Sequence, residues 1–202
     1  MEIRMSKHNL GAYKKNRDFK RTNEPKEDKA ASTCRRIFVI QKHDASHLHY
    51  DFRLQNEDVL VSWAVPKGLS TIPNKKHLAI RTEDHPVDYA QFEGVIPKGE
   101  YGAGTVLVWD IGDYEPLMED GEKSMNEALV KGALKIKLQG KKLQGGYALA
   151  RIRKKKDKEQ WVIFKLDDKF ADARRNPVST EPDSVLSGRS LEEIAEEEQD
   201  DE

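Results

Sequence analysis

The chain has 202 residues, 37% of them hydrophobic, a formal net charge of −1 and one cysteine. This length fits one globular domain with tails, so two independent cores are not expected. The lone Cys34 excludes an internal disulfide framework, and we interpret it as a spectator because nothing beyond Arg35 and Arg36 suggests activation. Without an apolar run of about 18 residues or the apolar segment of a signal peptide, a cytoplasmic protein that does not enter a membrane is expected.

Charge is distributed unevenly along the chain. Residues 1–36 carry eleven Lys and Arg against five Asp and Glu, whereas residues 171–202 carry three against eleven. We interpret residues 1–35 as a basic arm with one short helical turn, suited either to a polyanionic partner such as nucleic acid or to solvent. Residues 171–202 are interpreted as an acidic tail, a short helix or disordered, whose simplest role is solubility.

Residues 36–170 are expected to form the folded domain. They open with an apolar, β-branched run at 36–41. Further short segments typical of strands follow at 47–54, 59–65, 76–81, 105–110, 133–138, 146–153 and 160–165. The best helix is EKSMNEALVKG (122–132), with Ser124 as N-cap and Gly132 after its end. Turn-forming residues separate short strands without long helical windows. This pattern predicts a mainly β fold, a sandwich or a compact barrel of about eight strands with one or two flanking helices.

The segment HLHYDFRL (47–54) alternates polar and apolar residues, so its histidines, Asp51 and Arg53 share one face of a strand. Residues two apart on a strand have Cα atoms about 6.6 Å apart, so His49 and Asp51 could converge on one cation. His43 in the preceding QKHD could complete a set of two histidines and one carboxylate. On spacing alone His47 competes with His49, and a hydrogen-bonded histidine cluster without metal is the alternative.

Two further features suggest phosphate chemistry. Arg53 follows Asp51 on the same face, and a guanidinium beside a cation suits a phosphate, although a buried pair with Asp51 is the alternative. Pro86 is expected to place His85 on a loop, where it could act as a general acid or bind phosphate together with Tyr89. The glycine-rich IPKGEYGAG (96–104) lacks the ending of a P-loop, which favours a tight turn between strands.

Taken together, these motifs resemble the 3′-phosphoesterase module of bacterial ligase D, a DNA repair ligase of end joining. The matching stretches follow one order over about 150 residues: RDFKRTNEP (17–25), FVIQKHDASHLHYDFRL (38–54), SWAVPKG (62–68), EDHPVDYAQFEG (83–94), IPKGEYGAGTVLVWD (96–110) and WVIFKLDD (161–168). The resemblance implies a compact β-barrel and a site that uses Mn²⁺, with Co²⁺ or Zn²⁺ as alternative occupants. It also implies removal of a 3′-terminal ribonucleoside from DNA, followed by hydrolysis of the remaining 3′-phosphate to a 3′-OH.

Carried over by motif, the resemblance implies a metal site formed by His43, His49 and Asp51, which leaves His47 outside. It implies that Arg53 and His85 bind the scissile phosphate, that His85 is a candidate acid, and that Tyr89 donates a hydrogen bond to this phosphate. The supporting residues around the phosphate would be Gln41, Lys67, His77 and Glu83.

The resemblance further implies that the arm folds over the site and assists ribonucleoside removal through Arg17, Asp18 and Glu24. One departure is His77, which stands where the family carries an arginine, so a titratable imidazole replaces a permanent cation. The implied partners are DNA 3′ ends and, because the chain has no KxDG motif for adenylylation, a separate DNA ligase.

Two other classes of function stay open at this point. A non-haem iron oxygenase also uses two histidines and one carboxylate, although its last histidine usually lies much later in the chain. A non-enzymatic module that binds DNA ends or recruits a ligase is the second alternative.

Overall fold

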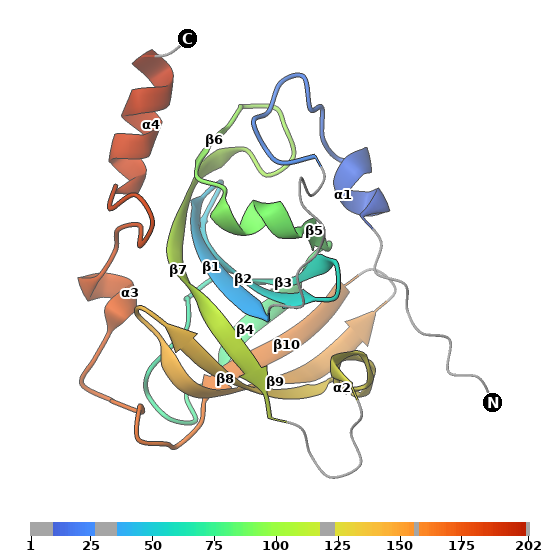
Figure 1. The fold of residues 1–202 in the computed structure, drawn as a ribbon, viewed down its shortest axis with the longest axis vertical. Helices are drawn as coiled ribbons and strands as arrows, with labels where there is room; N and C mark the ends of the chain where they lie inside the picture. The colour runs from blue at the N-terminus through green and yellow to red at the C-terminus, as the bar shows by residue number, and fades with distance from the viewer. Residues whose placement is uncertain (1–9, 27–35, 118–123, 156–157, 201–202) are drawn as a thin grey trace, which may run out of the picture.

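The structure, a computed structural model, describes residues 10–26, 36–117, 124–155 and 158–200. Within these ranges eight long strands form a closed antiparallel barrel (Figure 1). In neighbour order they are β1 (Ile37–Asp44), β2 (Leu48–Asn56), β3 (Val59–Val65), β4 (His77–Arg81), β10 (Lys158–Lys165), β9 (Gln144–Lys155), β8 (Ala133–Gly140) and β7 (Gly104–Pro116). Pairing of β7 with β1 closes the barrel, which confirms the predicted mainly β fold and excludes the sandwich.

Shorter elements lie outside this ring. Strand β5 (His85–Pro86) pairs with β3, the 3₁₀ helix η1 (Val87–Gln91) follows it, and β6 (Gly94–Ile96) pairs with β7. The described helices are α1 (Gly11–Lys15), α2 (Met125–Lys131), α3 (Pro177–Thr180) and α4 (Leu191–Asp200).

Helix α2 confirms the helix predicted from its caps, although residues 122–123 lie outside the described residues, as does Cys34. The Ser124 hydroxyl accepts a hydrogen bond from the Glu127 amide at 3.2 Å, and Gly132 ends the helix at φ +81°. Both features satisfy helix ends in the way that the sequence predicts, because serine accepts from free amides and glycine adopts positive φ at low cost.

The barrel wall separates two apolar clusters, because successive side chains of a strand point to opposite faces. The larger cluster fills the interior with residues from all eight strands, including the fully buried Trp63 and Trp161. The smaller cluster lies on the outer face and joins Val39 and Leu60 of the wall to Tyr13 of α1 and other residues of the covering segments. The outer face of β1, β2 and β3 is therefore covered by other parts of the chain.

The apolar face predicted for 47–54 is correct for three of its four residues. Tyr50, Phe52 and Leu54 are buried in the interior cluster. Leu48 is 46% exposed, which corrects the prediction for this residue, because it begins the strand next to the turn that connects β1 to β2.

Both flanks of the barrel contain packed residues. Helix α1 and the chain after it lie over the outer face near η1, and α4 lies beside β6 and β7 (Figure 1). Leu191 and Ile194 of α4 are buried, so this acidic segment is a packed helix in addition to being charged. The division into arm, barrel and tail stays a prediction as a domain assignment. Among the described helices none has the length and apolar character required to cross a membrane.

Candidate metal centre and active site

A cavity of about 210 Å³ lies on the outer face of the barrel wall. Strands β1 and β2 supply polar lining residues from the face opposite the apolar interior, as the alternation of 47–54 predicts. The segment 82–85, the arm and the β6–β7 loop line the remaining sides. The lining residues that carry polar or aromatic side chains are Arg17, His43, His49, Asp51, Arg53, Thr82, Glu83, His85, Tyr89 and Tyr101.

Three candidate metal ligands meet at the hairpin of β1 and β2. Register pairs His43 with His49 across the two strands, and Asp51 lies one outward-facing position further along β2. His43 Nδ1 lies 3.6 Å and His49 Nε2 lies 3.7 Å from the same Asp51 oxygen, Oδ2. One ligand atom from each residue lies within 4.8 Å of the other two.

In each histidine, the ring nitrogen that does not face Asp51 lies next to a backbone carbonyl oxygen. His43 Nε2 is 2.9 Å from the carbonyl oxygen of Gly102, and His49 Nδ1 is 2.9 Å from that of His47. A carbonyl only accepts, so each ring donates its N–H outward and turns its unprotonated nitrogen toward Asp51. Metal-binding histidines have this arrangement, and two imidazoles with a carboxylate suit a divalent transition metal. The residues present therefore fit such an ion.

His47 contributes its backbone and not its ring to this group. Its side chain is exposed, and its carbonyl orients His49. The geometry thus separates the two histidines that spacing alone could not distinguish.

Asp51 is held as a carboxylate by its neighbours. Arg53 Nη2 donates to Asp51 Oδ2 at 3.1 Å. Burial by itself would raise the pKa of Asp51, but the adjacent Arg53 guanidinium lowers this pKa well below its usual range. The ligand set therefore carries a negative charge at neutral pH.

Arg53 is positioned by a chain of hydrogen bonds. Its Nε donates to Gln41 Oε1 at 2.7 Å, and Gln41 Nε2 donates to the carbonyls of Tyr89 and Phe92, each at 3.0 Å. The guanidinium carbon lies 4.9 Å from the centre of the Tyr89 ring, a cation–π distance. Gln41 thus connects the barrel wall to the covering segment and orients Arg53.

His85 lies between two guanidinium groups. Its Nδ1 lies 2.9 Å from the Glu83 carbonyl, which only accepts, so Nδ1 carries the proton and Nε2 faces Arg17 Nη2 at 3.4 Å. Arg53 Nη1 lies 3.0 Å from Nδ1, but a protonated Nδ1 cannot accept a hydrogen bond from it. Arg53 Nη1 can therefore donate to an acceptor atom of a ligand. Burial, followed by the charges of Arg53 and Arg17, lowers the pKa of His85 well below its usual value, so the ring is neutral near pH 7.

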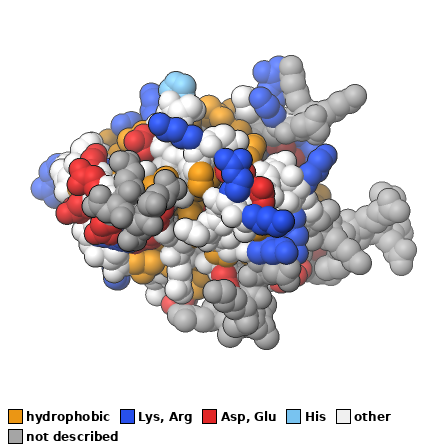
Figure 2. Space-filling model, turned by 90° about the horizontal axis from the view of Figure 1, so that it is seen from above, with side chains coloured by type: hydrophobic (Ala, Val, Ile, Leu, Met, Phe, Trp, Pro, Cys, Tyr) orange, Lys and Arg blue, Asp and Glu red, His pale blue; other side chains and the backbone are white. Residues whose placement is uncertain are grey.

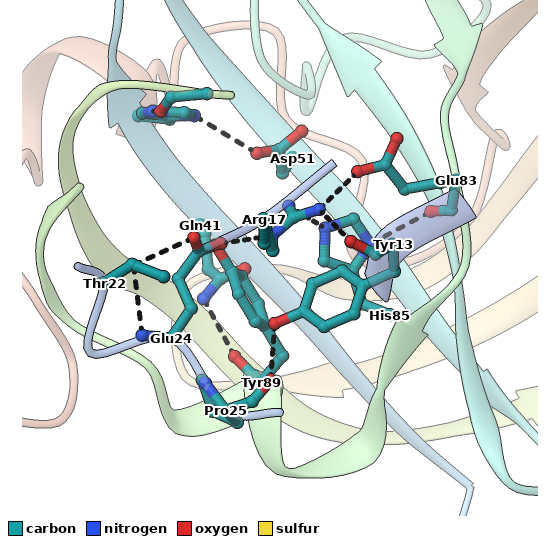
Figure 3. Close-up of polar contacts among 12 residues, drawn as sticks. Tyr13, Arg17, Thr22, Glu24, Pro25, Gln41, Asp51, Glu83, His85 and Tyr89 are labelled. Carbon is teal, nitrogen blue, oxygen red and sulfur yellow. Dashed lines mark hydrogen bonds and ion pairs between the residues drawn. The ribbon is translucent and has the colours of Figure 1, made fainter. Parts of the chain in front are cut away.

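The arm contributes a buried ion-pair network (Figure 3). Arg17 Nε donates to Glu24 Oε1 and Arg17 Nη1 donates to Glu83 Oε1, both at 2.8 Å. The same Glu24 oxygen accepts a hydrogen bond from the Tyr89 hydroxyl at 2.9 Å. The Arg17 and Glu24 side chains are only 4% and 0% exposed. Segments far apart in sequence therefore share one polar network beside the cavity.

Five predicted site residues are not part of the cavity lining that the structure describes. Gln41 and Glu24 contact residues that line it, whereas Asp18, Lys67 and His77 do not take part in these contacts. Asp18 is exposed and accepts from the Lys20 amide at 3.1 Å, and Lys67 is exposed in the turn after β3. His77 begins β4 and its Nδ1 lies 2.6 Å from the Gly68 carbonyl. Their predicted roles with phosphate or nucleoside stay predictions.

Sequence reasoning missed the contribution of the β6–β7 loop. It correctly predicts tight backbone at 96–104, where Gly102 has φ +82°, but it assigns no role to Tyr101 or Gly102, which line the cavity. The available signal was an aromatic residue among glycines, at a point where the chain must approach another segment closely. Sequence reasoning also gave no indication that Tyr13 contacts the site residue Arg17, whose guanidinium carbon lies 3.9 Å from the centre of the Tyr13 ring.

Comparisons with a family model and with curated proteins both match this chain to DNA ligase D. The family described as "DNA Ligase D 3'-phosphoesterase domain" matches residues 41–151. The "Multifunctional non-homologous end joining protein LigD" of Pseudomonas aeruginosa is 46% identical over 186 residues, which are 90% of this chain and 22% of that protein.

A second relative is the "Multifunctional non-homologous end joining DNA repair protein LigD" of Mycobacterium tuberculosis, 44% identical over 78% of this chain and 20% of its own length. The chain thus spans about a fifth of the length of these curated relatives. The family match includes the candidate metal ligands and Arg53. The chain therefore belongs to the DNA ligase D 3′-phosphoesterase domain family.

Proposed function

We propose that the chain is a metal-dependent phosphoesterase that heals DNA 3′ ends for repair by end joining. It would remove a 3′-terminal ribonucleoside as a phosphodiesterase and then hydrolyse the 3′-phosphate as a phosphomonoesterase. The observation that carries this proposal is the juxtaposition of the His43, His49 and Asp51 set with two guanidinium groups in one cavity. Family membership and the names of the relatives support a place in end joining.

His43, His49 and Asp51 would hold the cation, for which we propose Mn²⁺, with Co²⁺ or Zn²⁺ as alternatives. A divalent ion bound there would supply Lewis acidity and neutralise part of the charge of a phosphate. A facial triad of an iron oxygenase has the same donor types, but Arg53 and Arg17 beside the set favour a phosphate as substrate.

Arg53 and His85 would contact the phosphate. Gln41 and Tyr89 hold the Arg53 guanidinium in place, and Arg53 Nη1 has a donor for a phosphate oxygen. A phosphate anion between Arg53 and Arg17 would offset their effect on the pKa of His85. The ring could then take up a proton and pass it to the leaving oxygen.

The surface around the arm suits a DNA backbone. Lys14, Lys15, Lys20 and Arg21 are exposed there. Figure 2, a view onto the end of the molecule that carries the arm, shows Lys and Arg side chains at several places on this face, with most of the acidic ones at one side. Such cations bind phosphates without sequence preference. We propose that a separate DNA ligase seals the healed ends.

The direct test uses the purified chain, Mn²⁺ and labelled primer-templates that end in a 3′-ribonucleotide or a 3′-phosphate. Gel analysis should show conversion of both to a 3′-OH end, with a 3′-phosphate intermediate from the first substrate. His49→Ala should abolish conversion, whereas the matched variant His47→Ala should retain it, because His47 uses only its backbone carbonyl. DNA binding without conversion by any divalent metal would instead support a non-enzymatic end-binding module.

A further inference from the structure

Tyr101 differs from every other tyrosine of the protein in its exposure. All six tyrosines lie in the described part of the chain, and five of them are at most 3% exposed. Tyr101 is 54% exposed, yet it lines the cavity that contains the metal ligands and Arg53. An aromatic ring at the edge of a polar cavity is available to a ligand, since it has little to pack against in the protein itself.

The backbone around Tyr101 is held on both sides. Glu100, before it, forms an ion pair with Arg21 at 3.0 Å, and the Ala103 amide donates to the Glu100 carbonyl at 3.1 Å. Gly102, after it, accepts from His43 Nε2 at 2.9 Å. The loop that carries the ring is therefore connected to a candidate metal ligand and to the arm, and these contacts hold the backbone on both sides of Tyr101.

The chemical neighbours of Tyr101 identify what could lie against it. The Arg17 guanidinium carbon is 5.7 Å from the centre of its ring, and Arg17 in turn binds Glu83, which also lines the cavity. Partial burial raises the pKa of Tyr101, and the nearby Glu83 carboxylate raises it further, so the hydroxyl stays protonated at neutral pH.

A carboxylate in this position has a chemical implication. Glu83 would repel a phosphate, but it can accept hydrogen bonds from the hydroxyls of a ribose, as acidic residues do in nucleotide sites. Figure 3 shows Arg17 and Glu83 directed toward each other beside His85. The cavity thus has a phosphate-binding part at Arg53 and His85 and, next to it, a part suited to a sugar, where Tyr101 lies.

We propose that Tyr101 is a substrate-binding residue that stacks on the ribonucleoside released in the phosphodiesterase step. This assignment rests on the proposed function and deepens it, because it places the leaving nucleoside on the Tyr101 and Glu83 side of the cavity. Aromatic side chains stack on any base, so the contact would tolerate all four ribonucleosides. The 3′-phosphate substrate of the second step has no nucleoside on that side and would not use the ring.

The test compares both steps on primers of the same sequence. In Tyr101→Ala the ratio of kcat/KM for ribonucleoside removal to kcat/KM for phosphate hydrolysis should decrease by about 5- to 150-fold, the usual worth of one base stack. The matched variant Tyr101→Phe keeps the ring and should restore the ratio. An unchanged ratio in Tyr101→Ala, or an equal decrease in Tyr101→Phe, would overturn the assignment.

A binding measurement separates failure of this inference from failure of the proposed function. If the wild-type protein converts neither substrate with any metal, the proposed function fails. DNA ending in a 3′-ribonucleotide should then still bind the wild-type protein more tightly than Tyr101→Ala, while DNA ending in a 3′-phosphate should show a smaller difference. Equal affinities of both proteins for the ribonucleotide end would refute stacking.

Discussion

His43 and His49 face each other across strands β1 and β2, with ring centres 4.8 Å apart, and both turn a free nitrogen toward the same oxygen of Asp51. The register of one hairpin sets this relationship, and two backbone carbonyls orient the rings. The candidate ligand set is thus arranged by contacts within the protein itself. If these residues bind a metal, its affinity would depend both on the three side chains and on the groups that orient them.

Metal affinity provides the first prediction. His49→Ala and Asp51→Asn should each weaken Mn²⁺ binding by at least about tenfold, because each removes a ligand or its charge from the set. Isothermal titration of the purified proteins with Mn²⁺ measures this directly. His47→Ala is the control and should bind like wild type. Unchanged affinity in Asp51→Asn would contradict the metal assignment.

The second prediction concerns pH and stability. The folded protein keeps His85 neutral, with a pKa well below 6.5, whereas an unfolded chain protonates histidine near pH 6.5. The unfolded state therefore binds more protons as pH falls below about 6.5. This decreases the free energy of unfolding by up to about 1.4 kcal/mol per pH unit until the folded pKa is reached.

His85→Gln removes this contribution, so its stability deficit relative to wild type should be largest at pH 7 and smaller at pH 5. Urea denaturation of both proteins in EDTA, across this pH range, provides the comparison. Parallel stability curves for the two proteins would show that His85 is not held neutral.

The buried ion pair of the arm provides the third prediction. Arg17→Met should destabilise the protein by about 3–5 kcal/mol, because it leaves the fully buried Glu24 carboxylate without its cation. The double variant Arg17→Met with Glu24→Gln should lose less than the sum of the two single variants. Chemical denaturation of all four proteins completes the cycle, and strict additivity would argue against a direct energetic coupling.

Helix α4 provides the fourth prediction. Glu198 Oε2 accepts a hydrogen bond from the Val95 amide of β6 at 2.8 Å, so a side chain of the acidic helix caps a strand edge. Glu198→Ala should speed hydrogen exchange of the Val95 amide, whereas Glu198→Gln keeps an acceptor oxygen and should have a smaller effect.

The same helix can be tested through its apolar side. Ile194→Ala should decrease the free energy of unfolding by about 2–5 kcal/mol, since Ile194 is fully buried. A change below about 0.5 kcal/mol would mean that α4 does not pack in solution.

Local patterns were sufficient for much of the fold. The eight barrel strands were predictable because β-branched runs and turn residues act within a few neighbours, and α2 was predictable from its two caps. The candidate ligands His43, His49 and Asp51 come from one hairpin, so alternation along 47–54 already groups two of them on one face. Choosing between His47 and His49 needed either family resemblance or the observed ring orientation.

Non-local contacts were not predictable in this way. Arg17 and Glu83 are 66 residues apart, and Glu198 and Val95 are 103 apart. Local sequence periodicity does not indicate which distant segments contact each other, because such contacts depend on which apolar surfaces are buried together in the folded protein. Asp18, Lys67 and His77 show the reverse case, since residue type and motif suggested a site while the fold leaves them outside the cavity lining among the described residues.

The sequence by itself thus determined the strands, the face on which the polar residues lie and the chemistry that they could perform, since all three follow from local side-chain direction and residue type. Tertiary structure decided the closure of β7 on β1, the docking of the arm beside His85 and the orientation of His43 by Gly102. Each of these brings together groups from separate segments, and only the packing of the whole barrel specifies such contacts.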